Sequence, residues 1–309
     1  MSLPSVLFIG IGNMGQPMAI NLARAGYSML VSDLDLGRAR ELEALGAVWT
    51  DDLVDAAARV DVVMLSLPGP AQVRDVLLGA RGVLAAMRDG AALIDTSTSS
   101  TELAREIGAI AADRHIDYLE APVTNAIDGA AAGRLTIFVG AETTAFERCR
   151  SLLGVLGNRV LHVGSHGNGA TVKLLTNLMW FVHAATVGEA LMLGAKAGVP
   201  LDTVREALMH SAGSSWVVEH DVPSIFAGHY DPSFSLALCC KDLKLVNDIA
   251  SEQGYELTMG RHAQTVFERA RQVYGDDAAE LHVVRLLEER AGLFLRPPHG
   301  QAAANDEAA

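Results

Sequence analysis

The chain has 309 residues, of which 50% are apolar and 20% are charged, enough for two domains of about 100–200 residues each. Its 24 basic and 37 acidic residues give a net charge of −13, which repels nucleic acid and anionic lipid surfaces, so neither is expected as a partner. The cysteines, at positions 149, 239 and 240, have no metal-ligand or disulfide spacing and indicate a reduced, cytoplasmic protein. No targeting segment precedes the first apolar run, and the apolar runs are interrupted before the ~20 residues of a membrane span.

The first half of the chain alternates β-rich runs with helical stretches. Nearly continuous apolar runs are typical of parallel strands that are buried on both faces. We predict strands at 6–10, 28–33, 60–68, 91–98, 116–124 and 134–140, with helices at 17–26 and 36–46 between the first of them. This alternation predicts βαβ units in a doubly wound parallel sheet, the α/β class.

The second half has only helical patterns. A long run at 167–196 is followed by helical runs at 201–210, 236–254 and 281–292. We therefore expect an α/β domain over residues 1–164, an all-helical C-terminal domain over 165–296 and a disordered tail over 297–309.

A glycine-rich turn joins the first predicted strand to the first predicted helix. It reads Gly10, Gly12 and Gly15, with Asn13 and Met14 before the last glycine. The first glycine allows a tight turn, the second lets a pyrophosphate approach the backbone, and the third lets helix and strand pack closely. In this setting the motif predicts a Rossmann-type dinucleotide site, and the alternative is a βα turn without a ligand.

The second predicted strand ends at an acidic residue. Asp33 lies 21 residues after Gly12, where a carboxylate accepts hydrogen bonds from the adenosine ribose and repels a 2′-phosphate. This favours NAD over NADP. Arg38 and Arg40 follow and can accommodate a phosphate, and the alternative for Asp33 is a turn or helix-capping role.

One lysine stands in an otherwise apolar, small-residue helix. Alcohol oxidation coupled to a nicotinamide needs a protein base, and Lys173 is the candidate. Partial burial and a nearby cation would lower its pKa toward neutrality. Asn177 lies one turn further on the same helix face, able to bind the substrate oxygen or hold the lysine. The alternative is a snorkelling lysine beside a core-edge asparagine.

Five ordered segments resemble one family. The segments are 8–22, 95–100, 120–140, 167–177 and 234–245. Together they are similar to the motifs of the β-hydroxyacid dehydrogenases, which include 3-hydroxyisobutyrate dehydrogenase and tartronate semialdehyde reductase. The resemblance implies hydride transfer between NAD(P) and the hydroxyl carbon, or semialdehyde, of a small anionic β-hydroxy acid. It also assigns Lys173 the general acid–base role and Asn177 the substrate-orienting role.

The same resemblance assigns a substrate loop and a second lysine. Thr124, Asn125 and Ala126 stand where the family has Ser-Gly-Gly, and they are expected to bind the substrate carboxylate. Asn125 tolerates a positive φ, although its side chain projects where the family has none. Lys241 is expected near the nicotinamide and the substrate; its alternative is a solvated charge paired with Asp242.

Three further residues are expected to contact the cofactor. Thr98 would lie at the carboxyl end of a parallel strand, where open α/β sheets bind ligands, and the resemblance places it against the nicotinamide or its ribose. Leu67 and Pro68 stand at another strand end and look like a cofactor-contacting turn.

Two other functions remain open at this point. Imine reductases resemble this family but usually lack the lysine at position 173, and a non-catalytic dinucleotide-binding module would lose it. The 167–196 helix would run about 45 Å, longer than a small domain needs, so we expect a homodimer or homotetramer. The acid stays unassigned among 3-hydroxyisobutyrate, glycerate, serine, threonate and a sulfonate analogue, and no histidine has metal-ligand spacing.

Overall fold

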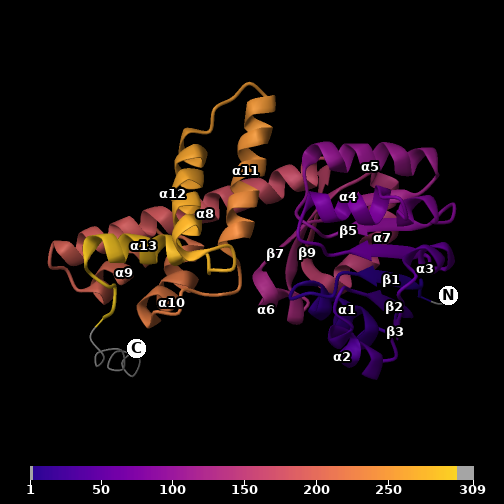
Figure 1. Ribbon diagram of the computed structural model, residues 1–309, viewed down its shortest axis with the longest axis horizontal. Coiled ribbons are helices and arrows are strands. Elements are labelled where there is room, and N and C mark those ends of the chain that lie inside the picture. Colours follow the sequence, from indigo (N-terminus) through magenta and orange to yellow (C-terminus); the bar gives the residue numbers. More distant parts are fainter. Residues whose placement is uncertain (1–2, 298–309) are drawn as a thin grey trace. The chain divides into compact units, whose positions relative to one another are not determined.

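A computed structural model describes residues 3–297, and the chain divides into two compact units, Met1–Leu174 and Leu175–Ala309 (Figure 1). The division falls inside one helix, α8 (Asn168–Lys196), later in the chain than the predicted boundary at residue 164. Of the predicted tail 297–309, residues 298–309 lie outside the described residues.

The first unit is built on a nine-stranded sheet. Its strands are β1 (Val6–Ile9), β2 (Met29–Ser32), β3 (Val48–Trp49), β4 (Val62–Leu65), β5 (Ala92–Asp95), β6 (Asp117–Glu120), β7 (Val123–Thr124), β8 (Leu135–Gly140) and β9 (Gly157–Gly164). They run in the order β3-β2-β1-β4-β5-β6-β8-β7, and β9 pairs with β8. The first six strands are mutually parallel, and β8 is antiparallel to β6 and β7. The order 3-2-1-4-5-6 is that of the Rossmann fold, which confirms the predicted class.

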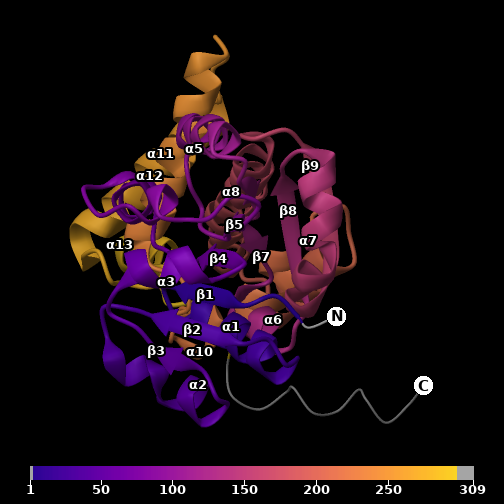
Figure 2. The ribbon, with the colours of Figure 1, turned by 90° about the vertical axis from the view of Figure 1, so that its right-hand side faces the viewer.

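Helices cover both faces of this sheet (Figure 2). Successive strand residues point to opposite faces, so Phe8 packs into one buried cluster and Leu7 into the other. One cluster includes α1 (Gly15–Arg24), α2 (Arg40–Ala44), α6 (Ala126–Ala131) and α7 (Thr143–Leu156); the other includes α3 (Leu53–Arg59), α4 (Pro70–Leu78) and α5 (Thr101–Asp113). Burial on both faces is the reason why the central strands read as uninterrupted apolar runs.

The strands differ from the prediction at three places. The run 116–124 forms two strands instead of one, because β6 ends at Glu120 and Pro122, which has no N–H to donate, separates it from β7. Strands β3 and β9 were not predicted. Most of their residues are exposed or half-buried, so they lack the apolar pattern that marks the central strands.

The second unit is helical, as expected. It contains the rest of α8, then α9 (Leu201–Met209), a π-helical turn Val217–Asp221, α10 (Val222–Ala227), α11 (Leu236–Glu252), α12 (Thr258–Tyr274) and α13 (His282–Ala291). Its core gathers around Phe181 of α8, whose ring centroid lies 5.3 Å from that of Phe267 on α12 and 5.1 Å from that of Trp180. Aromatic pairs at these separations stabilise a core beyond their buried area.

Helix α8 has almost the bounds of the predicted helical run at 167–196. Among residues 3–297 it alone is long and apolar enough, by length and composition, to cross a membrane. Gly188 and Glu189 interrupt the apolar run that follows Lys173, as the sequence indicated, but they do not end the helix. Long core helices of globular proteins meet the same criteria.

Candidate active site

The glycine turn has the geometry of a phosphate-binding turn. Gly10 has φ +88°, and a Cβ there would lie 2.4 Å from the Ser66 carbonyl oxygen. A Cβ on Gly15 would lie 1.9 Å from the Gly10 carbonyl oxygen, so α1 packs against the turn as only glycine allows. A Cβ on Gly12 would meet no atom within 4 Å. The backbone at Gly12 is therefore open to a ligand, and the residues present fit a dinucleotide diphosphate at the start of α1.

Asp33 ties the end of β2 to this turn. Its Oδ2 accepts a hydrogen bond from the Ile11 backbone N–H at 2.8 Å, and its Oδ1 accepts one from the Asp35 N–H at 3.1 Å. Beside it, Arg38 Nη1 donates to Asn13 Oδ1 at 3.4 Å. The turn role that was the alternative for Asp33 is therefore observed, and each carboxylate oxygen keeps a second lone pair with which to accept from a ribose hydroxyl.

The loops after β4 and β5 are also joined. The Leu67 backbone N–H donates to Ser97 Oγ at 2.9 Å, and the Ser97 N–H donates to Asp95 Oδ1 at 2.9 Å. Burial raises the pKa of the Asp95 carboxyl to about 6, an effect that the hydrogen bonds from Ser97 partly offset. Pro68 is exposed and Thr98 is half-buried in these loops, at the carboxyl end of the sheet where the sequence placed them.

The predicted substrate loop is strained. Asn125 has φ +89° and Ala126 has φ +54°, both in the left-handed region that favours glycine. The Asn125 side chain lies against the beginning of β8, where its Nδ2 donates to the Arg134 carbonyl oxygen at 3.0 Å and to Thr136 Oγ1 at 3.4 Å. Two non-glycine residues thus keep a glycine-type backbone, and Thr124 precedes them in β7, half-buried.

Helix α8 carries the predicted acid–base residues. Lys173 is 9% exposed and Asn177, one turn further, is 3% exposed. Asn177 Nδ2 donates to Asp242 Oδ2 of α11 at 2.7 Å, and Lys241 Nζ lies 3.1 Å from Asp242 Oδ1. The pairing of Lys241 with Asp242, the alternative given for this lysine, is observed, but the pair is largely buried rather than solvated.

The predicted residues thus form groups within each unit. In the first unit the glycine turn, Asp33, Leu67 and Thr98 gather at the carboxyl ends of neighbouring strands; in the second, Asn177 and Lys241 meet at Asp242. The sequence analysis missed Ser97 and did not recognise Asp242 as the partner of Asn177. Among residues 3–297, no group of three or more His, Cys, Asp or Glu side chains is arranged to hold a metal ion.

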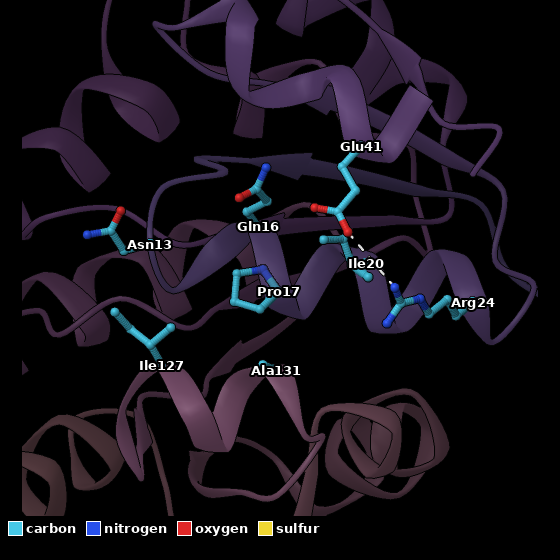
Figure 3. A pocket seen from close by; sticks show the side chains of 8 residues that line it. All are labelled: Asn13, Gln16, Pro17, Ile20, Arg24, Glu41, Ile127 and Ala131. Carbon is cyan, nitrogen blue, oxygen red and sulfur yellow. Dashed lines mark ion pairs between the residues drawn. The ribbon is translucent and has the colours of Figure 1, made fainter. Parts of the chain in front are cut away.

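A pocket of about 410 Å³ opens beside the glycine turn (Figure 3). Its eight lining residues come from α1, α2 and α6 and from the turn itself, and Arg24 and Glu41 form an ion pair of 3.9 Å at its rim. Asn13 is the one member of the predicted cofactor set among them. The pocket therefore borders the turn on the α1 and α6 side and is not the ligand site that the glycines define.

Comparison with known proteins agrees with this geometry. Residues 5–164 match the family model described as the NAD binding domain of 6-phosphogluconate dehydrogenase. Residues 167–287 match the model described as NAD-binding of NADP-dependent 3-hydroxyisobutyrate dehydrogenase. Fold and turn thus define a nicotinamide dinucleotide-binding oxidoreductase.

Individual relatives cover nearly the whole chain. The 2-(hydroxymethyl)glutarate dehydrogenase of Eubacterium barkeri is 36% identical over 85% of this chain and 88% of its own. The NAD-dependent L-serine dehydrogenase of Pseudomonas aeruginosa is 33% identical over 86% and 91%. The structure of Mycobacterium tuberculosis 3-hydroxyisobutyrate dehydrogenase with L-serine superposes with a TM-score of 0.85, at 30% identity over 93% of this chain and 99% of that one. The chain belongs to the β-hydroxyacid dehydrogenase family, the NAD(P)-dependent oxidoreductases of small hydroxy acids and semialdehydes.

Proposed function

We propose that this protein transfers a hydride between NAD and the hydroxyl carbon of a small β-hydroxy acid, with Lys173 as the general acid–base group. The observation that carries the proposal is a lysine that is 9% exposed on an apolar helix, one turn before an asparagine whose amide is held by Asp242. A buried lysine without a function is costly, since desolvation disfavours its charge.

The chain's own residues divide the chemistry as follows. A bound nicotinamide supplies the hydride acceptor or donor. The neutral amine of Lys173 takes the hydroxyl proton during oxidation, and its ammonium form returns a proton to the carbonyl oxygen during reduction. Asn177 donates one amide hydrogen to Asp242, which fixes the amide plane, and the amide held in this way would bind the substrate oxygen.

Carboxylate recognition is assigned to the strained loop. The Thr124 hydroxyl and the backbone amides of Asn125 and Ala126 would bind the acid, because the left-handed backbone directs successive N–H groups to one side. Lys241 adds the positive charge that an anionic substrate needs in a protein of net charge −13. L-Serine is our first substrate candidate, since two relatives are named with it. Threonate, 3-hydroxyisobutyrate and glycerate follow.

NAD is the preferred nucleotide in this proposal. The Asp33 carboxylate is fixed by two backbone N–H groups at the end of β2, where a 2′-phosphate would meet its negative charge. Arg38 supports the alternative, but an Asp35 carboxylate lies 3.8 Å from it and competes for its charge.

Assembly and location extend the proposal. Only 33% of the most apolar window of α8 is buried, and Leu175, Met179 and Leu193 are exposed on one face of it. A second copy of the chain would cover this face and give a homodimer or homotetramer. Met179→Glu should dissociate this assembly to monomers, as measured by light scattering. Cys149, Cys239 and Cys240 are all free and buried, in keeping with a reducing compartment such as the cytoplasm.

The test is the absorbance of reduced nicotinamide with each acid, with NAD and with NADP. We expect turnover with NAD, and we expect Lys173→Ala to lower kcat by at least ~10² while nucleotide affinity stays nearly unchanged. A cyclic imine offered with the reduced nucleotide should not be turned over. Normal turnover by Lys173→Ala would remove the lysine from the mechanism, and nucleotide binding without turnover of any acid would favour the non-catalytic reading.

A further inference from the structure

A buried carboxylate lies against the beginning of α8. Glu120, the last residue of β6, is 3% exposed, and its Oε1 accepts a hydrogen bond of 2.5 Å from the Gly169 backbone N–H. The N–H groups of Gly167 and Ala170 also stabilise its negative charge. The first amides of a helix have no partner inside the helix and carry its positive dipole end. Glu120 therefore caps α8 from 49 residues earlier in the chain.

Two glycines make this contact possible. A Cβ on Gly140 would lie 2.2 Å from Glu120 Oε1, and a Cβ on Gly169 would lie 2.9 Å from the same atom. Gly140 is also the residue paired with Glu120 between β8 and β6. The strand pairing and the absence of a Cβ at both glycines together fix the position of the Glu120 carboxylate.

The capped amide lies one turn before Lys173. Gly169 and Lys173 are four residues apart on one helix, so they share a face, and a helical side chain tilts toward the preceding turn. Both residues belong to the first unit, as does Glu120. We propose that Glu120 is a positioning residue, whose carboxylate fixes the first turn of α8 and through it the Lys173 amine. This inference rests on the proposed acid–base role of Lys173.

The charged surroundings make the contact sensitive to pH. Burial raises the pKa of Glu120 to about 7, and the negative charge of Asp95, its pairing partner on β5, contributes. Tyr118 of β6 is also close enough to interact with the Glu120 charge. Arg105 of α5 and His166 stand nearby, against Gly167 and Gly108 of the same region. Since the anion binds the helix amides more strongly than the acid does, we expect the positioning to weaken as pH falls through about 7.

The experiment compares Glu120→Gln with Glu142→Gln in the full chain. Glu142 also lies at the N-terminal end of a helix, α7. Its side chain is exposed and makes no capping hydrogen bond, so Glu142 is the matched control. We expect Glu120→Gln to lower kcat roughly 10- to 100-fold with the KM for NAD unchanged, as for a displaced catalytic group. The pH profile of kcat should lose the Glu120 ionisation near pH 7 and keep that of Lys173, and Glu120→Asp, which keeps the charge, should restore the lost ionisation. Glu142→Gln should behave as the unsubstituted protein.

A second readout does not depend on turnover. Amide exchange at Gly169 and Ala170, and the pH dependence with which an amine reagent labels Lys173, should both change in Glu120→Gln and not in Glu142→Gln. Gly140→Ala, which displaces the carboxylate without removing it, should give the same signature. Unchanged exchange and labelling would overturn the positioning role. Changed labelling with normal turnover in Lys173→Ala would instead overturn the proposed function and leave the contact standing.

Discussion

Asn177 and Asp242 form a buried hydrogen bond of 2.7 Å between residues that are 65 positions apart. Asn177 is 3% exposed and Asp242 is 1% exposed, so neither group can exchange its partner for water. The carboxylate also faces Lys241, which makes it the common partner of an amide and an ammonium group. The side chain that orients the substrate in our proposal is thus held by an acid that comes from α11.

This bond predicts a large stability difference between two aspartates of α11. Asp242→Ala should lower the free energy of unfolding by about 3 kcal/mol, because it leaves the Asn177 amide without this acceptor and the Lys241 charge without this counter-ion. Asp248→Ala on the same helix removes only an exposed ion pair with Lys244 and should cost no more than about 0.5 kcal/mol. Urea unfolding of both variants measures the difference, and equal losses would contradict the argument.

The substrate loop predicts opposite signs for two substitutions in α6. Ala126→Gly should stabilise the protein by about 0.5 kcal/mol, because relief of the left-handed strain exceeds the entropy that glycine gains on unfolding. Ala131→Gly, at an exposed and right-handed position of the same helix, should destabilise it by up to about 1 kcal/mol. Thermal unfolding decides, and a loss of stability at both positions would show that Ala126 is not strained.

Asp95 predicts a pH dependence of stability. Its folded pKa of about 6 lies above the ordinary value of 3.8, so the folded state binds the proton more tightly. The resulting stability is fully present below about pH 3.8 and is lost as pH rises through 6, a cost of up to about 3 kcal/mol by pH 8. Asp95→Asn keeps an acceptor for Ser97 and avoids the charge. It should therefore be more stable than the unsubstituted protein at pH 8, with a gain that fades toward pH 4.

The control for this measurement is the exposed Asp89→Asn, which should show no such pH-dependent gain. Chemical unfolding at several pH values gives both curves. If Asp95→Asn raised the free energy of unfolding by the same amount from pH 4 to pH 8, the gain would not come from the ionisation of Asp95.

Asp33 predicts the nucleotide preference. Asp33→Asn removes the charge and one of the two acceptors that bind Ile11 and Asp35, so the KM for NAD should rise roughly 10-fold. The KM for NADP should rise less or fall, since the repulsion of the 2′-phosphate is lost. The ratio of kcat/KM for the two nucleotides checks this, and an unchanged ratio would separate Asp33 from nucleotide choice.

The sequence predicts the parts of this protein that depend on local pattern. The glycine turn after β1, the central strands and the long helix follow from apolar runs and from glycines at fixed spacing, and the doubly wound α/β class follows from the alternation of strands and helices. Strand β9 escapes because its side chains are mostly exposed. Glu120 and Asp242 escape for another reason: each bonds a residue 49 or 65 positions away, and nothing in the neighbouring sequence marks that partner.

The burial of all three cysteines has a practical consequence. Desolvation raises the pKa of Cys149 and of Cys240 to about 11, and Cys239 is fully buried, so thiol reagents at neutral pH would find little thiolate to attack. A cysteine introduced at Leu45 or Val273, both exposed, would then be the preferred point of attachment for a dye or spin label. One label in each unit would let spectroscopy follow the protein during nucleotide binding without first replacing the native cysteines.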